Sequence, residues 1–212
     1  MNIGIIGSGN VGKALAGAAT RAGHKVKIAA NDQEHARAAA EATGARPATS
    51  NRDVIDGADL VILAVPAPKV DEVLASIGSD LDGRVLVDVT NRVNRQEPGQ
   101  VLDGSSMAEH IQQKVPKAKV VKAFNYAFAS RMADPKVDGT RLDGYVAGDD
   151  QPAKQTVMGL AESIGFRPID AGPLVMARAL EAMALLNILL QIQHGWPWQS
   201  GWKMIGPTGE AR

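Results

Sequence analysis

The feature that most constrains this chain is a glycine-rich turn near its N-terminus. The apolar run MNIGII at residues 1–6 leads into Gly7, Gly9 and Gly12, spaced as G-x-G-x-x-G, and small helix-compatible residues follow at 10–22. Between a strand and a helix, the first glycine allows a tight turn, the second lets the backbone approach a pyrophosphate, and the third lets the helix pack closely on the strand. Free N–H groups at the helix start then face the phosphates. The turn therefore predicts dinucleotide binding, and the alternative is a turn that serves packing alone.

Strand-like apolar runs recur along the chain and alternate with helix-like segments. After the first run they cover residues 25–30, 59–65, 84–89 and 118–124. These runs are continuously apolar rather than alternating, which is typical of strands covered on both faces in a parallel sheet. The sequence therefore predicts an α/β fold of the Rossmann type, a doubly wound parallel sheet in a domain spanning residues 1–124.

The remaining residues, 125–212, predict a small C-terminal α+β extension. It contains a strand at 144–147, a helix at 152–164, a strand at 166–169 and a long helix at about 174–193. That last helix is apolar on nearly all sides, and a helix with so little polar surface must be buried against something large. We therefore expect a homodimer that forms through the 174–193 helix; the alternative is a central helix packed wholly inside one chain.

Composition limits the classes of partner. The 212 residues include 23 Lys plus Arg and 23 Asp plus Glu, so the net charge is zero and nothing favours nucleic acid or an acidic membrane surface. Arg178, Glu181 and Asn187 interrupt the most apolar stretch, which argues against a membrane span. The chain contains no cysteine, and no spacing of His with carboxylates predicts a metal site. Because the N-terminus carries no basic and apolar leader, we expect a cytoplasmic protein.

The residues after the second predicted strand bear on the kind of dinucleotide. Asp32 lies 20 positions after Gly12, about where an acidic residue accepts the ribose hydroxyls of NAD and repels the 2′-phosphate of NADP. No Arg or Lys occurs from Ile28 to Glu34, so this segment mildly favours NAD. Asp32 could equally act only as the N-cap of the helix that follows, and both interpretations stay open.

Small and polar residues follow the next predicted strands. Ala64, Val65 and Pro66 suit a wall against a nicotinamide ribose, while Asn91 and Asn125 offer polar groups to the nicotinamide end. Ligands of open α/β sheets lie outside the carboxyl ends of the strands, so these residues converge on one edge. The alternative for the DVTN segment around Asn91 is a turn built by Asx and Thr hydrogen bonds. No Lys, His or Glu stands in a motif that identifies a general acid or base.

Several stretches resemble the F420-dependent NADP reductase family, also called NADPH-dependent F420 reductases. They are IGIIGSGNVGKALA at the start, VVKAFN, GDD at 148–150 and, most specifically, GFRPIDAGPL at 165–174. The similarity covers essentially the whole chain. It implies an oxidoreductase that transfers a hydride between a nicotinamide dinucleotide, NAD(P)H, and a second flat cofactor, the deazaflavin coenzyme F420. Such a transfer leaves the chemistry to the two cofactors, which agrees with the lack of an acid–base motif.

The resemblance also implies roles for single residues. Ser8, Gly9, Asn10 and Val11 would hold the pyrophosphate, Ala64, Val65 and Pro66 would face the nicotinamide, and Asn91, Asn125 and Tyr126 would face the deazaflavin or substrate. The chain departs from the family at Ala30 and Asn31, which precede Asp32, because the family commonly has Ser-Arg or Thr-Arg there. Contacts to a 2′-phosphate are therefore missing. Tyr126 is a second departure, and its bulk changes the pocket of the second cofactor.

Two other functions stay open from the sequence. A protein that binds NAD(P) as a sensor or carrier, without turnover, would result if Tyr126 and the segment Trp196–Trp202 closed the cleft. A reductase of a C=O or C=N bond in a small metabolite, in the manner of pyrroline-carboxylate reductases, also combines a Rossmann half with a helical dimer. The wording of GFRPIDAGPL favours hydride transfer with F420 over this third function.

Overall fold

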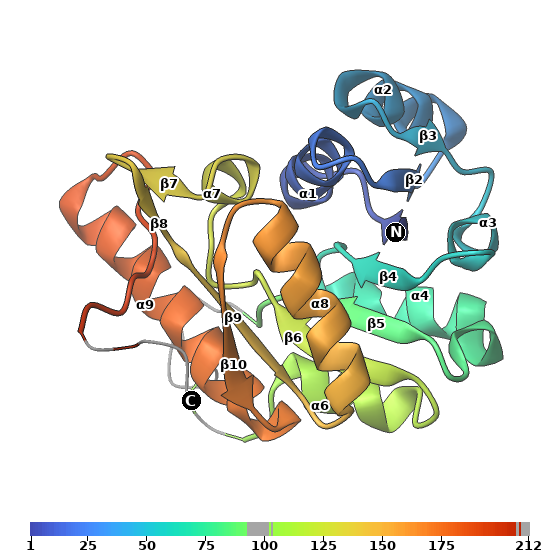
Figure 1. Cartoon of the computed structure of the whole chain (residues 1–212). Helices are drawn as coiled ribbons and strands as arrows, with labels where there is room; N and C mark the ends of the chain where they lie inside the picture. The colour runs from blue at the N-terminus through green and yellow to red at the C-terminus, as the bar shows by residue number, and fades with distance from the viewer. Residues whose placement is uncertain (93–101, 103, 207, 209–212) are drawn as a thin grey trace.

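The computed structural model describes residues 1–92, 102, 104–206 and 208, and its centre is one eight-stranded sheet (Figure 1). The strand order is β10-β9-β6-β5-β4-β1-β2-β3. The strands are β1 (Asn2–Ile6), β2 (Lys25–Ala29), β3 (Arg46–Pro47), β4 (Leu60–Leu63), β5 (Val85–Asp88), β6 (Lys119–Ala123), β9 (Asp143–Gly148) and β10 (Arg167–Gly172). All neighbouring pairs are parallel except β6 and β9. The predicted Rossmann-type α/β sheet is confirmed.

Helices cover both faces of the sheet. They are α1 (Asn10–Arg21), α2 (Gln33–Thr43), α3 (Asn51–Ile55), α4 (Val70–Ile77), α6 (Met107–Lys114), α7 (Ala129–Ala133), α8 (Gln151–Ser163) and α9 (Ala177–His194), with the short 3-10 turns η1 (Ala67–Lys69), η2 (Gly78–Leu81) and η3 (Leu174–Met176). Leu15 of α1 and Leu160 of α8 belong to the apolar core on one face. Leu74 of α4 and Ile111 of α6 belong to the core on the other face. The strands are therefore covered on both sides, as their continuous apolar runs indicate.

The described elements differ from the sequence prediction mainly where they are short. The two-residue strand β3 and the hairpin of β7 (Lys136–Val137) and β8 (Thr140–Arg141) carry too little pattern to be predicted. The hairpin sits where the chain turns back after α7, and β9 then runs antiparallel to β6. The strands expected at 144–147 and 166–169 are present as β9 and β10, and they extend the main sheet.

Helix ends follow local sequence signals. Ser106 accepts a hydrogen bond from the backbone N–H of Glu109, and the Glu109 side chain accepts one from the Ser106 backbone N–H, which together form a capping box at the start of α6. Ser50 caps α3 in the same way through the backbone N–H of Asp53. Asp32 caps α2. These caps set where each helix begins. They therefore set where the loop before each helix ends.

Helix α9 crosses from one layer of the molecule to the other. Ala177 at its start belongs to the core with α4 and α6, whereas Leu180 and Ala184 belong to the core with α1 and α8. The helix therefore passes the carboxyl ends of β5 and β6, and Figure 1 shows it along the side of the sheet that carries β9 and β10.

The far side of α9 is partly unpartnered. Leu186 and Ile192 each expose about half of their surface at 48%. Within the described part of the chain, Leu174–His194 is the one helical segment that has the length and apolar composition of a membrane span, and less than half of it is buried. Its opposite side holds polar residues of the interior, Glu181 and Asn187, so the helix is integrated into this fold.

Candidate functional site

The glycine-rich turn brings β1, α1 and the end of β4 into direct contact. A Cβ atom on Gly12 would lie 1.9 Å from the carbonyl oxygen of Gly7, and one on Gly7 would lie 2.3 Å from that of Ala64. Gly7 also has a φ of +114°, which side chains rarely adopt. Gly9 is different, because nothing lies within 4 Å of a Cβ built on it. The first and third glycines are therefore required by the fold, while the second leaves open space above the turn.

The N-terminus of α1 faces that space. Its first residue is Asn10, no side chain caps the helix, and Gly9 at the N-cap has an extended φ of −70°. Backbone N–H groups at an uncapped helix start are available to bind an anion, and the helix dipole favours negative charge there. Ser8, Asn10 and Val11 lie in this turn, as the sequence analysis expected for a pyrophosphate site.

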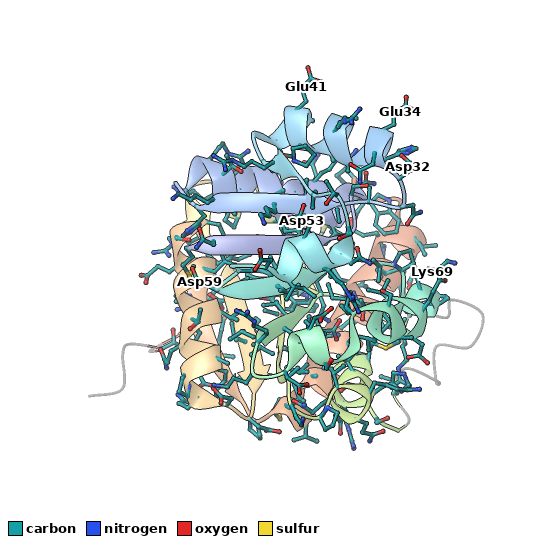
Figure 2. The ribbon with its side chains drawn as sticks, turned by 90° about the vertical axis from the view of Figure 1, so that its right-hand side faces the viewer. Asp32, Glu34, Glu41, Asp53, Asp59 and Lys69 are labelled. Atoms are coloured by element: carbon teal, nitrogen blue, oxygen red, sulfur yellow. The ribbon has the colours of Figure 1, made fainter. Side chains whose placement is uncertain are left out.

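Asp32 lies beyond the end of β2, at the same edge of the sheet. Figure 2 shows Asp32 and Lys69, which follow β2 and β4, at one end of the strands, and Asp59, which precedes β4, at the other. The Asp32 carboxylate accepts the backbone N–H of His35 at 2.9 Å and contacts the ring Nδ1 at 2.7 Å. These hydrogen bonds, from the backbone first and the ring second, lower the pKa of Asp32. Asp32 is an N-cap, and its exposed carboxylate is ionised at neutral pH.

A pocket of about 160 Å³ opens beside the turn, at the carboxyl ends of β5 and β6, and is called the β5–β6 pocket below. Its lining comes from α1, the loops after β5 and β6, α7 and α9 (Val11, Val89, Asn91, Asn125, Tyr126, Ala127, Phe128, Ala129, Met132, Ala184 and Ile188). Four of these residues were expected in the site, namely Val11, Asn91, Asn125 and Tyr126. None of these described lining residues is charged. Ala64 and Val65 lie against Gly7 of the turn, and Ala64, Val65 and Pro66 are not among the described residues that line this pocket.

Sequence analysis missed the contribution of α7 and α9 to this pocket. Ala184 and Ile188 lie one turn apart on α9 and reach the pocket from a helix about 60 positions beyond Asn125. The sequence predicts the apolar helix at 174–193. Its hydrophobic periodicity does not indicate which face meets the sheet, because nearly every face is apolar.

Asn91 and Asn125 are joined by hydrogen bonds between the loops that follow β5 and β6. Asn91 Nδ2 donates to the backbone carbonyl of Asn125 at 2.7 Å, and Asn125 Nδ2 donates to Asn91 Oδ1 at 2.8 Å and to the carbonyl of Leu180 on α9 at 3.0 Å. Asp88 and Thr90 of the same loop instead form a turn, in which Asp88 Oδ1 accepts both the N–H and the hydroxyl of Thr90. Asp88 and Thr90 therefore form the hydrogen-bonded turn that was the alternative interpretation of the DVTN segment. Asn91 and Asn125 both face the pocket.

A buried ion cluster of Lys122, Asp88 and Glu181, the Lys122 cluster, lies directly beneath these loops. Lys122 Nζ donates to Asp88 Oδ2 and Glu181 Oε1 at 2.8 Å each and to the carbonyl of Thr90 at 2.6 Å. The side chains of Lys122 and Asp88 are fully buried and that of Glu181 is 2% exposed. An ammonium has three protons, so every donor of Lys122 is used. The cluster ties β5 and β6 to α9 without facing the pocket.

Tyr126 points its hydroxyl away from the pocket. The hydroxyl donates to the carbonyl of Asp143 at 3.2 Å and accepts the backbone N–H of Tyr145 at 2.6 Å. Burial raises the pKa of Tyr126, so the phenol stays protonated. Only the ring of Tyr126 can contact a ligand, and this residue shapes the pocket without exchanging protons.

A larger depression of about 410 Å³ lies at the opposite end of the sheet, around the starts of β1 and β2. Ligands of open parallel sheets bind at the carboxyl ends of strands, and that depression borders the amino ends. The glycine turn, the open helix N-terminus and the β5–β6 pocket together define a Rossmann-type dinucleotide-binding protein.

Comparisons with known proteins narrow this class to a family. The family model for "NADP oxidoreductase coenzyme F420-dependent" matches residues 2–92. The chain is 32% identical over 212 aligned residues to the F420-dependent NADP reductase of Methanothermobacter thermautotrophicus, covering 92% of this chain and 90% of that protein. The chain therefore belongs to the F420-dependent NADP oxidoreductase family.

Two further relatives differ in length, because one is much longer than this chain and the other is about as long. It is 30% identical to the rat metalloreductase STEAP3 over 86% of its own length, but spans only 36% of that protein. The crystal structure of a candidate F420-dependent NADP reductase from Arthrobacter sp. FB24 superposes with a TM-score of 0.86 at 30% identity, covering 97% of this chain and 100% of that one. A reductive aminase from Aspergillus terreus, at a TM-score of 0.69 and 18% identity, shares the fold alone.

Proposed function

We propose that this protein is an oxidoreductase that transfers a hydride between a nicotinamide dinucleotide and coenzyme F420. The observation that carries the proposal is the β5–β6 pocket directly beside the glycine-rich turn, whose described lining residues carry no charge. Hydride transfer between two rings needs orientation and exclusion of water more than an acid or a base, and the two bound cofactors supply the hydride donor and acceptor. Family membership supports the same reaction.

The chain's own residues bind and orient the cofactors. The uncapped start of α1, with Ser8, Gly9, Asn10 and Val11, holds the pyrophosphate through backbone N–H groups. Ala64, Val65 and Pro66 form the wall on the ribose side. Asn91 and Asn125 are the polar groups at the ring end, and apolar side chains of α7 and α9 exclude water there.

The segment 30–32, which ends in the ionised Asp32, favours NADH over NADPH in this chain. The Asp32 carboxylate opposes a 2′-phosphate, and the nearby His35 is already paired with it. No Arg or Lys lies between residues 28 and 34. Asn31 and Asp32 are therefore assigned to the adenosine ribose, although the family is named for NADP.

The two parts of the chain divide the work. Residues 1–124 carry the dinucleotide, and residues 125–212 carry the second substrate and the dimer contact. The exposed apolar side of α9, with Leu186 and Ile192, supports a homodimer through residues 174–193. Leu186→Glu should convert the dimer to a monomer in light scattering after size-exclusion chromatography, and an unchanged mass contradicts this contact.

The test of the activity is a titration with NADH and NADPH, with and without oxidised F420, that follows the nicotinamide absorbance. Oxidation of the nicotinamide only when F420 is present supports the proposed reaction and ranks the two dinucleotides. Tight binding with no turnover contradicts it.

A carrier or sensor of NAD(P) is the second candidate. Phe128 lines the β5–β6 pocket, and Trp198 packs edge-on against its ring with centroids 5.3 Å apart. This contact places the C-terminal segment beside a side chain that lines the pocket. Turnover with F420 in the titration above excludes this candidate as the main function.

A further inference from the structure

One buried hydrogen-bond acceptor in the β5–β6 pocket has no partner among the residues that the structure describes. Asn125 is 4% exposed and lines the pocket, and within that part of the chain its Oδ1 atom makes no hydrogen bond. Leaving a buried acceptor unpaired costs about 1–3 kcal/mol. Such an atom in a pocket is satisfied when a ligand brings a donor to it.

The orientation of the Asn125 amide is determined by its neighbours. Asn125 Nδ2 faces the carbonyl of Leu180, and Asn91 Nδ2 faces the backbone carbonyl of Asn125. A carbonyl accepts and never donates, so both amide nitrogens are assigned by backbone groups and neither side chain can be flipped. The free atom is therefore an oxygen, which calls for an N–H or O–H donor.

The backbone before Asn125 is strained. Phe124 has a φ of +64°, and the N–H of Asn125 donates to the carbonyl of Ala123 at 2.8 Å. A hydrogen bond across one residue with positive φ is the geometry of the rare, strained γ-turn. Strain of this kind clusters at ligand sites, because surrounding structure has to hold it in place. Phe124 is 1% exposed and is held by the core, so the turn keeps Asn125 at the pocket.

We propose that Asn125 Oδ1 accepts a hydrogen bond from the carboxamide N–H of the nicotinamide ring, an inference that rests on the proposed function. The pocket begins at Val11 on the phosphate-binding turn, so it adjoins the end of the dinucleotide that carries the ring. A cavity of about 150 Å³ is known to take one benzene ring, and this pocket of about 160 Å³ matches a single ring rather than the three fused rings of a deazaflavin.

The chemistry of the pocket also matches a neutral amide. No charged residue is among the described residues that line it, so these residues would leave a cationic or anionic group unpaired, whereas a carboxamide needs only hydrogen bonds. Asn125 is thus a positioning residue: it turns the ring about its bond to the ribose and selects which face of the ring meets the second cofactor. Asn91 supports it by occupying the Asn125 amide nitrogen.

The test compares dinucleotides that differ only at this donor. In 3-acetylpyridine adenine dinucleotide a methyl group replaces the amide NH2, so the donor is lost and Oδ1 stays buried without a partner. Calorimetric titration of the wild-type protein should give a Kd for the analogue about tenfold weaker than that for NAD. In Asn125→Ala the ratio of the two Kd values should fall close to one, even if both affinities drop.

Asn187→Ala is the matched control. Asn187 is also 4% exposed and hydrogen-bonded in the interior, but it does not line the pocket. It should keep the tenfold ratio. A ratio that stays at ten in Asn125→Ala, or a ratio of one in the wild-type protein, overturns the assignment while dinucleotide binding still stands. Failure of the wild-type protein to bind NAD or NADP at all instead overturns the proposed function, and this inference with it.

Discussion

The glycine-rich turn and the loops above the Lys122 cluster lie at the same edge of the sheet, but they are built from different materials. The turn uses backbone groups within six consecutive residues, Gly7 to Gly12, and excludes side chains by contacts as short as 1.9 Å to a built Cβ. The loops rest on ions drawn from three elements, with Lys122 separated by 34 positions from Asp88 and by 59 from Glu181. The proposed phosphate site is therefore formed by consecutive residues, whereas the proposed ring site depends on residues from distant parts of the chain.

This difference implies different sensitivities. A side chain added at Gly7 or Gly12 should disrupt the turn, because the backbone would have to move. Loss of a charge from the Lys122 cluster should destabilise the ring side, because a buried ion would lose its partner. The four predictions below test that contrast, starting with the largest expected effect.

Lys122→Met should cost about 3–5 kcal/mol of unfolding free energy, because it leaves Asp88 buried without its cation and Glu181 with only the more distant Arg92, 4.0 Å away. Urea denaturation measures it. Adding Asp88→Asn and Glu181→Gln to Lys122→Met should recover a large part of the loss, because no net charge is then left in the cluster. If the triple variant is no more stable than Lys122→Met, the loss comes from packing and the contrast with the turn is weakened.

Gly9→Ala and Gly12→Ala should separate the ligand role of the turn from its folding role. Gly9 has a φ of −70° and open space at its Cβ, so Gly9→Ala should keep its melting temperature and lose about 1–3 kcal/mol of dinucleotide binding, roughly ten- to hundredfold. Gly12→Ala should lower the melting temperature as well, because its Cβ meets the Gly7 carbonyl. Equal melting temperatures for the two variants contradict the assignment.

Asn31→Arg combined with Asp32→Ser should change dinucleotide preference by about tenfold toward NADPH, the effect of one charge-assisted hydrogen bond at an exposed site. Ser keeps the N-cap of α2, so stability should change little. The ratio of Kd values for NADH and NADPH is the measurement, and Asp32→Asn serves as the control that removes charge alone. An unmoved ratio means that the 2′-position of the ribose does not lie at residues 31–32.

Glu109→Gln should have the smallest effect, about 1 kcal/mol or less at pH 7, because the Arg178–Glu109 pair that joins α9 to α6 is half-exposed. The Arg178 hydrogen bond, followed by those from Ser106, lowers the pKa of Glu109 from 4.5 to about 2. A depressed pKa stabilises the folded protein above pH 4.5, and this contribution is lost as the pH falls toward 2. The difference in unfolding free energy between wild type and Glu109→Gln should therefore shrink over that window. Arg178→Gln should behave alike, and a gap that persists at pH 2 contradicts the pairing.

Much of the phosphate side could be predicted from the sequence, because its determinants are local. The spacing of Gly7, Gly9 and Gly12 predicts the turn. Asp32 and Ser106 are residue types that favour the N-cap and so indicate helix starts. Less of the proposed ring site could be predicted from the sequence. Asn91 and Asn125 were predicted to converge because strand ends share an edge, but their mutual hydrogen bonds and the free Asn125 Oδ1 depend on Leu180, far along the chain.

The sequence by itself determined the sheet, its Rossmann-type order of strands and helices, and the phosphate-binding turn, because apolar runs and glycine spacing act over a few residues. Tertiary structure alone decided that β9 reverses direction, that α9 crosses the carboxyl ends of β5 and β6, and that Glu181 pairs with Lys122 in the interior. A helix apolar on nearly every face carries no periodic signal of which face is buried. The buried face of α9 carries polar side chains that have partners in the interior, Glu181 beside Lys122 and Asn187 beside Ser200.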